Sequence, residues 1–179
     1  TNRVNLGDPL NLTALVSPTQ SLSNFKFMWF EGATSLVGNK DMITVKPNTT
    51  DTAAVAYTVI ATSPNGCTAQ DILLVHVLQP KVAFPNAFTP NGDALNNVFR
   101  MVVLEGLATI ETMEVYNRWG QKVFSSTDPK AAWDGNLDGK PAPADVYAYI
   151  IRWRDGLGAL GIHTGDVTLV ADRRDEQAV

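Results

Sequence analysis

Apolar side chains recur at every second position along short stretches of the chain, and this alternation limits the fold more than any other feature. The clearest runs cover residues 10–16, 25–29, 55–61 and 73–77. Each run ends in residues that favour turns, such as Ser-Pro or Asn-Gly. A period of two is typical of strands that bury one face. The sequence therefore predicts an all-β fold made of sandwiches.

A change in residue usage near Gln79 and Pro80 divides the chain of 179 residues. Each part is long enough for one small sandwich. We therefore expect two tandem Ig-like β-sandwich domains, residues 1–79 and residues 80–179. The chain starts at Thr1 without a signal segment, which indicates either a removed signal or a fragment of something longer. Because the first residues already predict a strand, we expect the C-terminal fragment of a larger protein.

The composition argues against several classes of function. A net charge of -4 and a pI of about 5.0 fit poorly to a phosphate backbone, so we expect no nucleic-acid partner. The single Cys excludes an intrachain disulfide and a Cys-cluster zinc site, and two His residues argue against a His-rich metal centre. No apolar run is long enough for a membrane-spanning helix.

Two aromatic residues of the first half are expected to anchor its core. Trp29 lies in a predicted middle strand and Tyr57 opens a later one, as in Ig-like sandwiches. Residues 57–71 resemble the F–G hairpin of PKD-like and bacterial Ig-like surface repeats, which implies a spacer domain. Cys67 is expected to be a small, partly buried thiol. A catalytic thiol would need a nearby His, and His76 lies on the following strand.

A hairpin is predicted at residues 115–124, with Asn117-Arg118-Trp119-Gly120 at its tip. Gly120 can supply the positive φ that a tight turn needs. If Trp119 is exposed, it forms with Arg118 and Gly120 a recognition site for other proteins. If it folds back, it caps the core or an edge. The sequence leaves both alternatives open.

Turns at Trp133-Asp134-Gly135 and Asp138-Gly139 precede a predicted strand at residues 146–153. Tyr147 and Tyr149 should share one face of that strand, with Ile150 on the other. A flexible connection is expected to begin at residues 155–158 and to lead to a short final strand at 167–170. Trp133 and Trp153 are expected in the core.

Three sequence blocks occur together in the second half: PNAFTPNGD (85–93), YNRWGQ (116–121) and WDGNLDGKPAPADVY (133–147). Over residues 82–171 they resemble the gliding-motility-associated C-terminal domain, the type B sorting domain of type IX secretion in Bacteroidota. The resemblance implies a folded export signal, read at the outer membrane with help from a PorP/SprF-type partner. It implies a cell-surface or extracellular protein, and structural roles for Trp133, Asp134, Gly135 and Tyr147.

The chain departs from the family pattern at a few positions. Ala94 and Asp145 stand where the family usually has Gly, and Asn97 stands where it often has Asp. Since Asp tolerates a left-handed backbone, Asp145 is expected to keep the turn. Residues 171–179 continue past the usual end of the family and are expected to be frayed.

An Asx-rich loop contains the weak calcium candidates, Asn91, Asp93, Asn96 and Asn97. Calcium prefers six to eight oxygen ligands with several carboxylates, and this loop offers one carboxylate, Asp93. The alternative is a network of hydrogen bonds from these side chains to the backbone. No other cofactor is expected.

Nothing in the sequence predicts catalysis. Glu105, Glu111 and Glu114 fall on or between strands without a recognisable catalytic pairing, and no G-x-S-x-G or phosphate-binding glycine loop occurs. We therefore expect a monomeric, non-enzymatic secretion module. The alternative function is an accessory carbohydrate- or adhesion-binding module of a secreted enzyme, which requires coplanar exposed aromatic side chains on one face.

Overall fold

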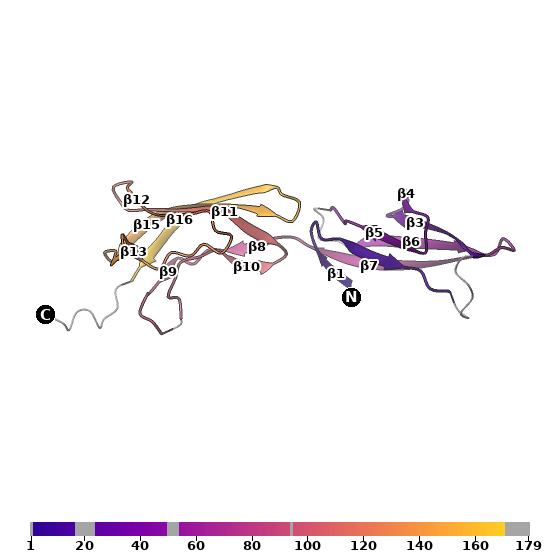
Figure 1. The fold of residues 1–179 in the computed structure, drawn as a ribbon, viewed down its shortest axis with the longest axis horizontal. Coiled ribbons are helices and arrows are strands. Elements are labelled where there is room, and N and C mark those ends of the chain that lie inside the picture. Colours follow the sequence, from indigo (N-terminus) through magenta and orange to yellow (C-terminus); the bar gives the residue numbers. More distant parts are fainter. Residues whose placement is uncertain (1, 17–23, 50–53, 94, 171–179) are drawn as a thin grey trace. The chain divides into compact units, whose positions relative to one another are not determined.

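A computed structural model describes residues 2–16, 24–49, 54–93 and 95–170 (Figure 1). The expectations for Ala94 and for residues 171–179 fall outside these ranges. The chain divides into two compact units, Thr1–Gln79 and Pro80–Val179. Strands fill both units, as the alternation predicted, and the all-β fold class is confirmed.

The first unit is a sandwich of a five-stranded and a two-stranded sheet. In the larger sheet the order is β1 (Asn2–Asn5), β7 (Thr68–Leu78), β6 (Val55–Thr62), β3 (Lys26–Glu31) and β4 (Ser35–Gly38). The smaller sheet pairs β2 (Leu10–Thr13) with β5 (Met42–Val45). Strand β1 runs parallel to β7, and the other neighbours are antiparallel.

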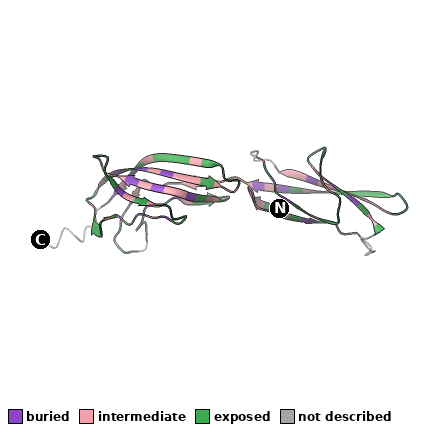
Figure 2. Ribbon diagram, turned by 45° about the horizontal axis from the view of Figure 1, so that its top comes forward, coloured by how far each residue is buried: buried purple, intermediate pink, exposed green. Residues whose placement is uncertain are grey.

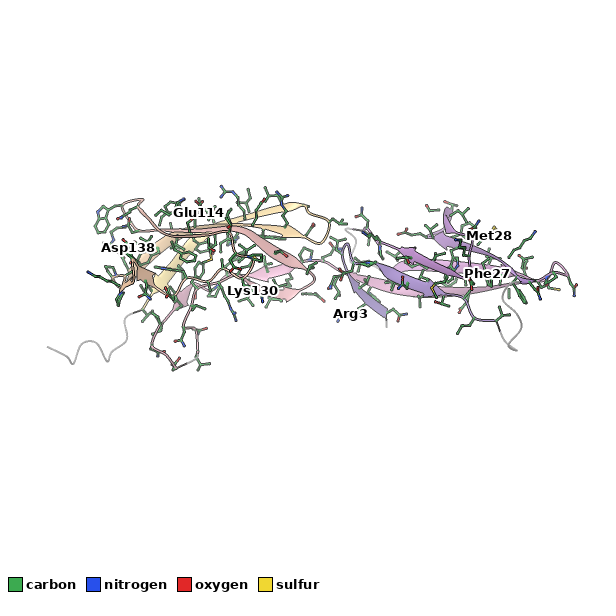
Figure 3. All side chains as sticks on the ribbon, in the orientation of Figure 1. Arg3, Phe27, Met28, Glu114, Lys130 and Asp138 are labelled. Carbon is green, nitrogen blue, oxygen red and sulfur yellow. The ribbon has the colours of Figure 1, made fainter. Side chains whose placement is uncertain are left out.

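The core of the first unit lies between these sheets, where Trp29 and Tyr57 are buried. Consecutive residues of β3 alternate as a half-buried strand requires: Phe27 is buried and Met28 is exposed (Figure 3). The Trp29 Nε1–H donates to the Lys40 carbonyl at 2.8 Å, which satisfies the polar atom of a buried ring. Burial, with a smaller effect of Glu31, raises the pKa of Tyr57 far above its usual value.

Cys67 lies in the turn between β6 and β7, and its expected partial burial is wrong: the residue is exposed. Its N–H donates to the Ser63 side-chain oxygen at 3.0 Å, and its carbonyl accepts the Ser63 N–H at 2.8 Å. The last strand pair before the turn is Thr62 with Thr68. Cys67 therefore lies past the end of the ladder, where no facing sheet covers it.

The second unit also has two layers. Its five-stranded sheet has the order β12 (Lys122–Ser126), β11 (Ala108–Tyr116), β15 (Asp145–Asp155), β16 (Leu160–Leu169) and β9 (Ala87–Phe88). The other layer contains β8 (Lys81–Ala83) paired with β10 (Val102–Glu105) (Figure 1). A short ribbon joins β13 (Asn136–Leu137) to β14 (Lys140–Pro141).

Aromatic rings fill the core of the second unit. Buried and more exposed stretches alternate along the strands (Figure 2). In β15, Tyr147, Tyr149 and Ile151 are buried, and the residues between them are more exposed. Trp133 is fully buried, and its ring centroid lies 4.8 Å from that of Tyr147. Trp153, also expected in the core, is partly buried and packs against the same cluster.

The last strand is longer than the sequence predicted. It starts at Leu160, and residues 155–159 form a hydrogen-bonded turn in place of the expected flexible connection. The Asp155 Oδ1 accepts the N–H groups of Leu157 and Ala159 at 2.9 and 2.8 Å. Two glycines in the strand explain the wrong expectation, since glycine alone weakens a strand prediction. Aromatic side chains of β15 lie over both of them, Trp153 over Gly161 and Tyr149 over Gly165.

Candidate recognition surface

The turn between β11 and β12 is held by the side chain of Asn117. Its Oδ1 accepts the N–H groups of Trp119 and Gln121, both at 3.0 Å. Backbone bonds join Gly120 N–H to the Asn117 carbonyl and Asn117 N–H to the Gln121 carbonyl, each at 2.9 Å. Gly120 has a φ of +76°. The tip therefore has one well-defined backbone conformation.

Trp119 projects from this turn with 81% of its surface exposed. The sequence left its position open, and the structure places it outside the core. The Arg118 guanidinium lies beside the ring, 5.7 Å from its centroid. The indole is a large apolar group that stands on a fixed backbone and is mostly exposed to water.

Arg118 is not a free cation at the tip, because it pairs with the carboxylate of Asp145 at the start of β15. The same Asp145 oxygen accepts the N–H of Val146 at 2.8 Å. The expected left-handed turn at Asp145 is wrong: among the described non-glycine residues only Asn96 and Asp138 have a positive φ. Asp145 instead begins the strand and joins it to the hairpin tip.

This pairing shifts both titrations in the direction that favours the ion pair. The hydrogen bond from Arg118 lowers the pKa of Asp145, and the Val146 N–H lowers it further. The same bond raises the pKa of Arg118. Both groups stay ionised through the physiological range, and the cation beside Trp119 is held in position.

Ion pairs continue along the outer face of the sheet, where Glu114 is labelled in Figure 3. Glu114 pairs with Lys122 of β12, and its Oε2 lies 3.4 Å from Arg152 of β15. The hydrogen bond from Lys122 is the main cause that lowers the pKa of Glu114. Glu111 pairs with Arg154 at 2.8 Å. These carboxylates bind across strands of their own sheet.

Hydrogen bonds hold together the segment from Trp133 to Tyr147, which leads into β15. The Trp133 Nε1–H donates to the Asn136 carbonyl at 2.9 Å, and Asp134 accepts both the backbone and the side-chain N–H of Asn136. The Tyr147 hydroxyl donates to the Pro143 carbonyl at 2.7 Å. Each of these polar atoms therefore has a partner inside the segment.

Gly135 occupies a position that a larger residue could not take without strain. Its φ is +80°, and a Cβ there would lie 3.1 Å from Leu169 Cδ1 and 3.2 Å from Pro90 Cγ. Both the backbone conformation and the close packing favour glycine.

The side chains of the Asx-rich loop bind one another and the backbone. Asp93 Oδ1 accepts the Leu95 N–H at 2.8 Å, and Asp93 Oδ2 accepts the Asn91 side-chain amide at 2.9 Å. Asn91 Oδ1 accepts the Asp93 N–H at 3.1 Å. A calcium ion at Asp93 would have to compete with these hydrogen bonds.

The other two calcium candidates act on the same loop. The Asn97 Oδ1 accepts the Gly92 N–H at 3.0 Å, and the Asn96 carbonyl accepts the Thr89 N–H at 2.8 Å. Across the part of the chain that the structure describes, no three His, Cys, Asp or Glu side chains gather where they could hold a metal ion. Calcium binding here stays a prediction.

Sequence reasoning named Arg118 as a recognition residue, but it did not predict that Asp145 pairs with it or that Asn117 holds the turn. Asp145 lies 27 residues away, and no local pattern links the two. Asn117 does carry a signal, because the side chain of an Asn at the start of a turn often accepts a hydrogen bond from the backbone two residues further on.

Among the described residues, no helix is long and apolar enough to cross a membrane.

Residues 82–165 match the family model of the CHU_C type IX secretion signal domain. The match lies within the second unit and covers the hairpin, the WDG segment and most of the sheet. This segment therefore shares the sequence pattern of type IX secretion signals. No curated protein matches the chain.

Solved structures give only distant likenesses. The three N-terminal domains of the bacteriophage RB49 outer capsid protein Hoc are 14% identical, with 92% of this chain and 55% of that chain covered and a TM-score of 0.49. The chain thus spans about half of that structure. The fibronectin(III)-like modules of Clostridium thermocellum CbhA are 14% identical, with 96% and 90% covered and a TM-score of 0.35.

Latent PorU from Porphyromonas gingivalis is 9% identical, with 96% of this chain and 19% of that chain covered and a TM-score of 0.35. None of these likenesses is close enough to argue function from. The fold assignment rests on the strands and sheets described above.

Proposed function

We propose that residues 80–179 are a folded signal that directs an attached protein through the type IX secretion system to the cell surface or the medium. The observation that carries the proposal is the family match at residues 82–165. Residues 1–79 then serve as a PKD/Ig-like spacer between the signal and the rest of the exported protein. The activity of that protein lies outside this chain.

The signal is proposed to work through its surface, with the β11–β12 tip as the contact site. Trp119 is 81% exposed, and the hydrogen bonds of Asn117 fix the backbone beneath it. A preorganised aromatic side chain gains affinity because little conformational entropy is lost on binding. Trp and Arg are also the residues most often found at the energetic centre of protein interfaces. The expected receptor is an outer-membrane component of the PorP/SprF type.

Catalysis has no place in the proposal. The carboxylates of Glu111 and Glu114 are engaged in ion pairs, and Asp145 is paired with Arg118. The alternative function, carbohydrate binding, needs several exposed aromatic rings on one face. Among the described residues, Trp119 is the one aromatic side chain with large exposure. A single ring gives no platform for a chain of sugars.

A secretion assay tests the proposal. A periplasm-directed fluorescent reporter is fused to residues 80–179, with and without residues 1–79, in a type IX-competent bacterium and in its secretion-null derivative. The expected result is reporter at the surface or in the medium of the competent strain only. If a folded, stable reporter stays periplasmic even when the native PorP/SprF-type partner is co-expressed, the proposal is wrong.

The contact site is tested with a matched pair of variants in the same assay. Trp119→Ala removes the exposed indole of the β11–β12 turn. Leu157→Ala removes an apolar side chain, 46% exposed, from the β15–β16 turn of the same sheet. Export should fall only for Trp119→Ala. Equal export of both variants would move the contact site away from the tip.

A further inference from the structure

Strand β10 has a hydrogen-bonding edge without a strand partner in the described residues. On one side it pairs with β8, where Val102 lies opposite Ala83 and Val103 opposite Val82. Strand β10 is an edge strand, because its sheet contains only β10 and β8. Val102, Val103 and Leu104 are apolar, and the charged residue of the strand, Glu105, stands at its end, where the pairing with β8 is irregular.

The segment before Trp133 pairs with the start of this edge at one position and then leaves it. Phe99 and Trp133 exchange two backbone hydrogen bonds of 2.8 Å, which is one antiparallel pair at the upstream end of the edge. The next step of that ladder would bring Ala131 beside Met101. Instead, the Ala131 N–H donates to the Asp128 carbonyl at 2.9 Å, and a turn takes the chain off the strand.

The five-stranded sheet that faces β10 is also incomplete near Ala108 and Ile110. Strand β12 pairs with β11 only from Met113 to Tyr116. Ala108 and Ile110 therefore have β15 on one side, and no strand of the described ranges pairs with them on the other. The result is a groove of about 350 Å³. Its lining includes Arg100, Met101, Val103, Ile110, Lys130 and Ala131.

The chemistry of the groove is apolar inside and cationic at its margin. Met101, Ile110 and Ala131 are buried, whereas Arg100 and Lys130 are exposed (Lys130 is labelled in Figure 3). No lining residue is acidic. Two acids lie close in sequence: Glu105 ends β10 beyond the lining, and Asp128 uses its Oδ1 to accept the Lys130 N–H at 2.8 Å.

We propose that an extended segment of a partner protein docks along β10 as an added strand. Its backbone continues the ladder that begins at Phe99 and Trp133, and alternate apolar side chains enter the groove. An acidic residue at the end of the segment meets Arg100 and Lys130, because the lining offers two cations and no carboxylate. The proposal concerns a surface apart from the Trp119 turn, and it stands whether or not the unit is an export signal.

A peptide titration of the full 179-residue chain tests this binding mode by NMR. Since an antiparallel segment has its C-terminal end beside Arg100, the probe is the synthetic peptide acetyl-Val-Thr-Val-Thr-Val-Glu-amide. One control peptide carries Lys in place of Glu, and another carries Pro in place of both Thr residues. The first control reverses the charge, and the second removes two backbone donors.

The acidic peptide is expected to shift the amide signals of residues 100–105 and 108–110 and to bind with a Kd on the order of 10⁻⁴ M. The Lys peptide should bind about tenfold more weakly, and the Pro peptide should not bind. Absence of binding, equal binding of the three peptides, or shifts confined to other strand edges would overturn the proposal.

Two variants of adjacent residues make the location specific. Val103 lines the groove and is 41% exposed, whereas Leu104 is 58% exposed and does not line it. Val103→Asp should weaken binding of the acidic peptide about tenfold, and Leu104→Asp should bind like the unchanged chain. Equal effects of both variants would argue against the groove.

A charge variant gives a test that does not alter the apolar lining. In the double variant Arg100→Ser and Lys130→Ser, the preference for the Glu peptide over the Lys peptide should disappear. This readout remains available if Val103→Asp fails to fold. A preserved preference would show that these two cations do not select the segment.

Discussion

The guanidinium of Arg118, at the tip of the β11–β12 hairpin, is paired with the carboxylate of Asp145 at the first residue of β15. The hairpin tip is thereby joined to the centre of the sheet. Trp119 stands next to this pair, so its backbone is held by Asn117 on one side and by a charge pair on the other.

Replacement of Arg118 should change the titration of Asp145. In Arg118→Gln the pKa of Asp145 should rise towards its ordinary value, because the main cause of its depression is removed. The Val146 N–H will keep part of the depression. A lowered carboxyl pKa means that the pair stabilises the fold above the ordinary carboxyl pKa and loses this effect as the pH falls through the lowered value. Carboxyl-carbon NMR titration measures the change, and an unchanged pKa in Arg118→Gln would contradict it.

Trp119 and Trp133 should respond in opposite ways to truncation. Trp119→Ala should change the free energy of unfolding by no more than about 0.5 kcal/mol, since the ring is exposed. Trp133→Ala should cost about 3–5 kcal/mol, since that ring is fully buried among other aromatics. Denaturant unfolding gives both values. A large loss for Trp119→Ala would mean that its ring supports the fold.

Replacing Gly135 or Gly139 by Ala allows the cost of backbone strain to be distinguished from the cost of close packing. Gly135 and Gly139 both have a positive φ, but a Cβ meets near neighbours only at Gly135. Gly139→Ala should cost about 1 kcal/mol, the price of the backbone conformation. Gly135→Ala should cost roughly 1–3 kcal/mol more, because Leu169 and Pro90 must move. Equal losses in thermal or denaturant unfolding would remove the packing argument.

Asp93 distinguishes a calcium site from a hydrogen-bond network. Asp93→Ala removes the acceptors of Leu95 N–H and the Asn91 amide, and should cost about 1 kcal/mol of stability. The loss should be the same with calcium and with a chelator. Calorimetric titration with calcium detects any binding, with Asp166→Ala, which removes an exposed carboxylate outside the loop, as the control. Stabilisation by calcium that depends on Asp93 would instead establish the site.

The sequence was informative where one local pattern decides the structure. Alternation located the strands, and Asn117 to Gly120 predicted a hairpin, because turn chemistry is set by adjacent residues. Leu160 to Gly165 were assigned wrongly because two glycines weaken the pattern, and only the rings of Trp153 and Tyr149 from the next strand make that segment a good strand.

The candidate sites depended more on residues that are distant in sequence. The exposure of Trp119 could not be predicted, since the turn alone does not decide on which side its ring lies. The pairing of Arg118 with Asp145 and the groove beside β10 both need the register of strands far apart in the chain. Cys67 was wrongly expected to be partly buried because the strand ladder ends one residue after it in sequence.

The long β15–β16 hairpin has a consequence for the order of folding. Its strands are neighbours in sequence and pair from Asp145–Leu169 to Arg154–Leu160, so the entropy lost in closing this loop is small. The pairing of β11 with β15 spans a much longer stretch of chain and should follow. The middle of the sheet therefore cannot assemble until the ribosome has made residues up to Leu169. If a receptor recognises the folded surface, only a polypeptide that extends past Leu169 presents it, and products truncated before that residue are not recognised.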